Sequence, residues 1–148
     1  MLEGNIEFRV RYAETDQMGV VYHTNYLVWC EMGRTELMRQ LGTAYADLER
    51  QGVYLAVCEA RVRFKAPARY DDLIRVNTKL LRVRTRGVHF HYLVEKPGGP
   101  VLAEAETELI CIDPQGVPRR IPEAVQQLLR RGVAETGQEG TLKAPTGV

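Results

Sequence analysis

The amino-acid sequence contains no serine among its 148 residues. Every catalytic scheme that depends on a serine nucleophile, such as Ser-His-Asp or Ser-Lys, is therefore excluded. That absence removes the largest class of acyl-transfer enzymes. It leaves a carboxylate as the strongest candidate for a nucleophile or a general base.

Long hydrophobic runs and a strong charge bias are also missing. No window reaches about 18 uncharged apolar residues, and the N-terminus has charges where a signal peptide needs an apolar stretch. We therefore expect a soluble, cytoplasmic protein. Twenty basic residues against 19 acidic ones leave a net charge of +1, which disfavours nucleic-acid binding through bulk charge. The length predicts one domain, residues 1–133, and a flexible Gly/Thr/Pro-rich tail, residues 134–148.

Cysteine and histidine are scarce. The cysteines Cys30, Cys58 and Cys111 lie far apart in apolar surroundings, which argues against a disulfide framework and against CxxC metal spacing. We expect all three to be buried small hydrophobic side chains. His89 and His91 share one strand face but lack a nearby third ligand, so an ordinary polar sheet face is preferred to a metal site.

The first third of the chain changes from strand to helix periodicity. Residues 6–11 alternate apolar and polar side chains, which predicts a strand with one buried face. Past the polar cluster of residues 23–25, the run to Leu41 predicts a long apolar helix of roughly 17 residues, closed by Gly42. Gly33, in its middle, indicates a close backbone approach to whatever the helix packs on. A second short helix is expected at residues 43–51.

The rest of the chain has strand periodicity until its last helix, predicted at residues 118–132. Short turns separate four predicted strands, at residues 53–65, 73–83, 88–95 and 101–112. We expect these strands to form an antiparallel meander. The fold class is therefore α+β, with one curved sheet wrapped around the enclosed long helix. Leu102, Ile110 and Ile112 should lie on the opposite sheet face, which favours pairing with another copy.

A lone carboxylate, Asp16, precedes the long helix. Asp16 and Gly19 form a turn pattern, and the polar cluster His23-Thr24-Asn25 then predicts the helix start. Such a start has unpaired N–H groups and a partial positive charge, so it can polarise a carbonyl oxygen beside the acid. Taken alone, the aspartate is more often simple turn chemistry.

Two segments resemble a known family. ETDQMGVVYHTNYLVWCEMGR, with the pattern D-x-x-G-V-V-Y-H-x-x-Y-x-x-x-x-E, and the later RVRFKAPARYDDLIRV are similar to the hotdog-fold acyl-CoA thioesterases of the 4-hydroxybenzoyl-CoA thioesterase type. The resemblance is greatest to the bacterial branch associated with the Tol-Pal envelope system. It covers residues 5–129.

The resemblance implies hydrolysis of an acyl-CoA thioester without a metal ion or a redox cofactor, in dimers or tetramers with sites at subunit interfaces. The family's catalytic aspartate matches Asp16, and the backbone donor for the thioester carbonyl matches His23. Asp16 could attack the carbonyl or activate a water molecule. The substrate-binding residues that we expect are Tyr22, beside the acyl group, and Arg84, Thr85 and Arg86, as a clamp for the phosphates of coenzyme A.

Two other functions stay open. A hotdog hydratase or dehydratase would use a histidine and a helix carboxylate, for which His23 and Glu31 are available. A non-catalytic protein that binds acyl thioesters would keep the fold without the chemistry.

Overall fold

The computed structural model describes residues 4–136, with side chains up to residue 133. In chain order, its elements are β1 (Asn5–Arg9), the 3-10 turn η1 (Tyr12–Glu14), α1 (Asn25–Gln40), α2 (Tyr45–Arg50), β2 (Tyr54–Phe64), β3 (Leu73–Val83), β4 (Gly87–Glu95), β5 (Val101–Ile112) and α3 (Glu123–Thr136). The predicted tail lies outside the described residues, except for residues 134–136, which continue α3.

Of the helices described, none has the length and apolar character needed to span a membrane. The cytoplasmic location expected from the sequence is a separate prediction that this observation does not test.

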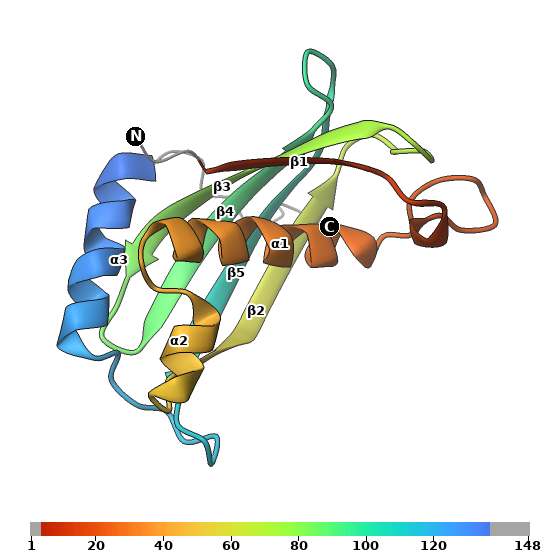
Figure 1. Cartoon of the computed structure of the whole chain (residues 1–148). Coiled ribbons are helices and arrows are strands. Elements are labelled where there is room, and N and C mark those ends of the chain that lie inside the picture. Colours follow the sequence, from red (N-terminus) through yellow and green to blue (C-terminus); the bar gives the residue numbers. More distant parts are fainter. Residues whose placement is uncertain (1–3, 137–148) are drawn as a thin grey trace, which may run out of the picture.

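All five strands form one antiparallel sheet in the order β1-β3-β4-β5-β2 (Figure 1). β3, β4 and β5 form a meander as predicted, but β2 pairs with β5, with Tyr54 opposite Ile112 and Phe64 opposite Ala103. The four-stranded meander is therefore wrong for β2. The physical reason is that residues 65–72 are too long for a tight turn. They cross from β2, at one edge of the sheet, to β3, which pairs with the strand β1 at the other edge.

α1 lies across one face of the curved sheet (Figure 1), and its sheet-facing side is buried. Trp29 and Met38 are fully buried in this core. A Cβ atom on Gly33 would lie 2.3 Å from Thr78 Oγ1 and 3.1 Å from Val76 Cγ1. The predicted close approach at this glycine is confirmed.

The other side of α1 is open in the chain described. Leu27, Val28 and Met32 are between 39% and 43% exposed. The prediction that the helix is enclosed therefore holds only for the side that faces the sheet, because one sheet supplies only one covering layer.

Two predictions about burial are wrong. Cys58 is exposed, unlike Cys30 and Cys111, because it occupies a bulge in the edge strand β2. Leu102 belongs to the core instead of the opposite face, at a register shift between β4 and β5. A single extra residue in a strand reverses the faces that simple alternation predicts.

The last helix begins at Glu123, five residues later than predicted. Pro118 forms an isolated bridge with Ile112, and the N–H of Ile121 donates to the carbonyl of Thr85 at 2.9 Å. Because a residue before proline disfavours the helical conformation, Pro122 keeps this connection extended until the helix starts.

Candidate active site

Asp16 opens a tight loop between η1 and α1. Its N–H donates to the carbonyl of Val20 at 2.8 Å, and its carbonyl accepts from the N–H of Gly19 at 2.9 Å. Gly19 has a φ of 80°, a conformation that favours glycine. The carboxylate oxygen Oδ1 accepts from the N–H of Met18 at 2.9 Å. The half-buried side chain therefore shapes the loop and is held by it.

The predicted helix start is confirmed at Asn25. The N–H groups of Asn25 and Tyr26 donate to the carbonyls of Tyr22 and His23. Those of His23 and Thr24 donate to no backbone carbonyl between residues 4 and 136, and the Thr24 side chain does not cap the helix. The start of α1 thus presents amide donors, together with the positive end of the helix dipole.

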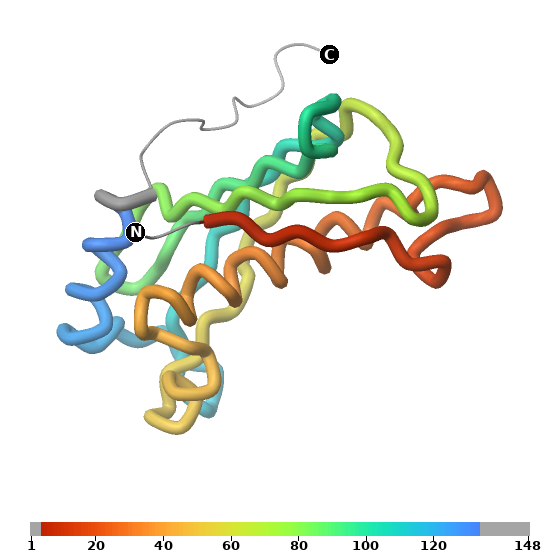
Figure 2. The backbone as a smooth tube through the Cα atoms, turned by 45° about the horizontal axis from the view of Figure 1, so that its top comes forward, coloured from red at the N-terminus to blue at the C-terminus, as the bar shows by residue number. Residues whose placement is uncertain are grey.

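The crossover of residues 65–72 fixes this corner of the molecule. Thr15 and Val21 form the bridge that closes the Asp16 loop into a hairpin. The N–H of Val21 donates to the carbonyl of Ala68 at 2.8 Å. The Asp16 hairpin, residues 15–21, therefore lies against the crossover at the end of the molecule where α1 begins (Figure 2).

A hollow of about 330 Å³ opens beside the helix start. The ring of Phe64 meets the rings of Tyr26 and His23 edge-on, at centroid distances of 5.2 and 6.3 Å. Burial raises the pKa of the Tyr26 hydroxyl, which keeps it protonated at neutral pH. The walls, which suit an apolar or aromatic group, include Val20, Val21, Tyr26, Phe64, Pro67 and His23.

The predicted site residues fall into two groups. Tyr22 is 47% exposed, and its ring centroid lies 4.5 Å from that of His23, so Tyr22, His23 and Asp16 share one end of the molecule. Arg84, Thr85 and Arg86 follow the far end of β3. Because β3 starts beside the Asp16 hairpin and rises about 3.3 Å per residue over its 11 residues, the two ends are about 33 Å apart.

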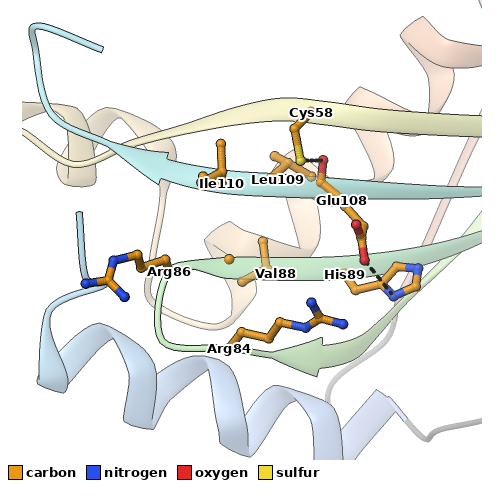
Figure 3. A pocket seen from close by; sticks show the side chains of 9 residues that line it. Cys58, Arg84, Arg86, Val88, His89, Glu108, Leu109 and Ile110 are labelled. Carbon is orange, nitrogen blue, oxygen red and sulfur yellow. Dashed lines mark hydrogen bonds and ion pairs between the residues drawn. The ribbon is translucent and has the colours of Figure 1, made fainter. Parts of the chain in front are cut away.

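The arginine turn has a cavity of its own, of about 210 Å³ (Figure 3). Arg84 extends along it toward the buried His89, whereas Arg86 lies at the other end and points away from His89. Cys58 and Glu108 from β2 and β5 complete the wall that the figure shows. Within one chain, these arginines do not meet Asp16.

His89 and His91 contact glutamates on β5. Nε2 of His91 lies 3.0 Å from Oε1 of Glu104, and His89 lies 3.7 and 3.8 Å from Glu106 and Glu108. These contacts are those of a polar sheet face, which we preferred to a metal site at His89 and His91. In the part of the chain described, no group of three or more His, Cys, Asp or Glu side chains is arranged to hold a metal ion.

Sequence reasoning missed two residues at this corner, Glu14 and Phe64. Glu14 is only 4% exposed and accepts a hydrogen bond from the indole of Trp29. The available signal was Trp29 itself, because a buried indole N–H usually needs an acceptor. Phe64 gave no signal, since its role depends on where the crossover leaves the end of β2.

A curved antiparallel sheet wrapped on one long helix is the hotdog fold, which this chain shares with solved thioesterase structures. This chain belongs to the Thioesterase-like superfamily, whose family model matches residues 10–129.

Individual relatives agree with this membership. The chain is 41% identical to YneP of Bacillus subtilis over 107 residues, which cover 72% of this chain and 78% of that protein. It is 33% identical to the acyl-CoA thioester hydrolase YbgC of Escherichia coli O157:H7, over 79% of this chain and 88% of that one. The crystal structure of the DHNA-CoA thioesterase of Staphylococcus aureus superposes with a TM-score of 0.83 at 31% identity, covering 91% of this chain and 93% of that one.

Proposed function

We propose that this protein hydrolyses the thioester of acyl-CoA to a free acid and coenzyme A. The observation that carries the proposal is the Asp16 hairpin before α1, together with the N–H groups of His23 and Thr24 at the helix start, which have no backbone acceptor among the described residues. The hydrolase activity named for the relative YbgC supports the substrate class. The narrower assignment, to the branch associated with the Tol-Pal system, is part of the same proposal.

In the proposed reaction, the N–H of His23 binds the thioester oxygen and stabilises the negative charge that develops there. A donor of this kind contributes about 3 kcal/mol in enzymes from which it has been removed. Asp16 either attacks the carbonyl carbon, which expels the thiolate and leaves an anhydride for water to hydrolyse, or takes a proton from an attacking water. The leaving thiol, with a pKa of roughly 8.5, departs without much assistance.

Isotope labelling tests the nucleophilic role of Asp16. In a single turnover in H₂¹⁸O, hydrolysis of the anhydride at the Asp16 carbon would place ¹⁸O in the Asp16 side chain, which general-base catalysis cannot do. Attack of water at the acyl carbon, by either route, places ¹⁸O in the product acid, so a labelled Asp16 is the outcome that decides for the nucleophile. Mass spectrometry of the peptide that contains Asp16 reads this directly.

The acyl group is proposed to occupy the hollow beside the helix start, with Tyr22 at its exposed rim. Tyr26 and Phe64 give this hollow aromatic walls. Apolar contact of this kind favours hydrophobic or aromatic acyl groups over charged ones.

A homo-oligomer, as a dimer or a dimer of dimers, completes the proposed site. β2 is an edge strand, and its Val57 and Phe64 are 48% and 49% exposed. The turn of residues 84–86 lies at the Tyr54 end of β2, since Gly87 and Tyr54 pair with neighbouring parts of β5. An antiparallel pairing of two β2 strands would therefore carry Arg84 and Arg86 of the partner subunit toward Asp16, where they can bind phosphates of coenzyme A.

A panel of aliphatic and aromatic acyl-CoAs tests the function, with thiol release followed by a colorimetric thiol reagent. We expect the best substrate to give kcat/KM of at least about 10⁴ M⁻¹ s⁻¹. Addition of water to an enoyl-CoA without thiol release would instead favour a hydratase. Binding of acyl-CoA without turnover across the whole panel would favour a non-catalytic binding protein.

A further inference from the structure

Glu14 is a buried carboxylate between the Asp16 hairpin and α1. The indole N–H of Trp29 donates to its Oε2 at 2.7 Å, and the backbone N–H of Arg11 donates to its Oε1 at 2.8 Å. The guanidinium Nε of Arg11 lies 3.5 Å from the same Oε1. A carboxylate that is only 4% exposed needs such partners, and they hold it in one position.

The backbone carbonyl of Glu14 makes two more connections. It accepts from the N–H of Tyr22 at 2.9 Å and from the side-chain amide of Asn25 at 3.0 Å. Asn25 is the first residue of α1, and Trp29 lies one turn further along the helix. Glu14 therefore joins the base of the hairpin to the first two turns of α1 through both its side chain and its backbone.

We propose that Glu14 is a positioning residue for the reaction, which fixes Asp16 relative to the helix start at His23. This inference rests on the proposed function. The hydrogen bonds within the loop fix the shape of the hairpin, whereas the Glu14 carboxylate ties that hairpin to α1. Because the attacking group and the carbonyl donor sit on these two separate pieces, a shift of about 1 Å between them can cost about 100-fold in rate.

Two variants break the carboxylate contact from its two sides. Glu14→Gln keeps the side-chain length but turns an amide NH₂ toward one of the two donors. Trp29→Phe keeps a buried aromatic ring and removes the indole donor. Tyr92→Phe is the control, because it deletes buried hydrogen bonds of similar kind away from the hairpin: one with Thr107 on β5 at 2.7 Å, and one from Arg34 in the middle of α1 at 3.5 Å.

The readouts are kcat, KM and the thermal midpoint, measured on the full chain with the best acyl-CoA at a temperature where every variant is folded. We expect Glu14→Gln and Trp29→Phe to lower kcat by about 10- to 100-fold with KM changed less than about twofold. The double variant should lose little more than the worse single variant, because both break one contact. Tyr92→Phe should lower only the midpoint.

A lower midpoint with unchanged kcat in both site variants would mean a merely structural role and would overturn the inference. If Glu14→Gln does not fold, Trp29→Phe alone decides. A wild-type chain without turnover overturns the proposed function and this inference together. An active wild type and an inactive Asp16→Asn, with full kcat in the Glu14 and Trp29 variants, overturns the inference alone.

Discussion

Asp16 and Asp113 form the same turn, and each is followed by a helix, α1 from Asn25 and α3 from Glu123. In each, the aspartate N–H donates to the carbonyl four residues on, and Oδ1 accepts from the N–H two residues on. Gly19 and Gly116, three residues after each aspartate, have φ angles of 80° and 81°. The aspartate and glycine spacing is thus explained by turn geometry at both places. What distinguishes Asp16 is its neighbour, the uncapped start of α1.

At the residue scale, Glu104 should make the free energy of unfolding depend on pH. Burial raises the pKa of Glu104, but the hydrogen bond with His91 and the ammonium group of Lys65 outweigh it, so the pKa lies below its usual value. A lowered pKa in the folded state means that the stabilisation is present above about pH 4.5, the unfolded value, and is lost as the pH falls through the folded value.

Urea unfolding of wild type and Glu104→Gln checks this. We expect the wild type to be the more stable at pH 6 and the difference to shrink toward pH 3. The exposed Glu49 provides the control variant Glu49→Gln, which should show no such trend. A difference between wild type and Glu104→Gln that stays constant over this range would contradict the assignment.

At the element scale, periodicity predicted which segments form strands and helices, but it did not predict the order of all the strands in the sheet. The helix start near His23 and the stop at Gly42 followed from local chemistry, and both are found. The position of β2 did not follow, because alternation in one strand carries no information about its neighbour in the sheet. The exposure of Cys58 depends on a bulge that only the paired strand reveals.

At Gly33, the backbone of α1 approaches the sheet closely. In Gly33→Ala, the new methyl group meets Thr78 and Val76, so we expect a net loss of about 1 to 2 kcal/mol in the free energy of unfolding, after the gain in helix propensity. Denaturant titration measures this loss.

Thr78→Ala should restore part of the loss when combined with Gly33→Ala, because Thr78 Oγ1 is the nearest atom and has no hydrogen-bond partner among the described residues. Equal stability of Gly33→Ala and wild type would contradict the close packing.

At the scale of the whole molecule, the predicted site residues lie at two separate ends of one chain. The hairpin, the helix start and Tyr22 are close in sequence, so their proximity could be predicted from the sequence. Arg84 and Arg86 could be assigned to phosphate binding only through a family resemblance. Their distance from Asp16 depends on strand length and order, which become known only with the fold.

Hybrid oligomers test whether two chains share the site. Asp16→Asn and the double variant Arg84→Ala/Arg86→Ala should each have low activity at subsaturating acyl-CoA. When the two are co-expressed, half of the random dimers are hybrids with one intact site, so roughly a quarter of wild-type activity should return. Activity no higher than the average of the separate variants would place the arginines and the aspartate of each site in one chain.

The central claim is that Asp16 performs chemistry beyond shaping its turn, and the most direct measurement compares Asp16→Asn with Asp113→Asn. Asparagine keeps the Oδ1 acceptor that each turn uses and removes the negative charge, so both hairpins should persist. In the thiol-release assay, we predict that Asp16→Asn lowers kcat by about 10²- to 10⁴-fold, whereas Asp113→Asn stays within about twofold of wild type. Full turnover by Asp16→Asn, or an equal loss in both variants, would contradict the account.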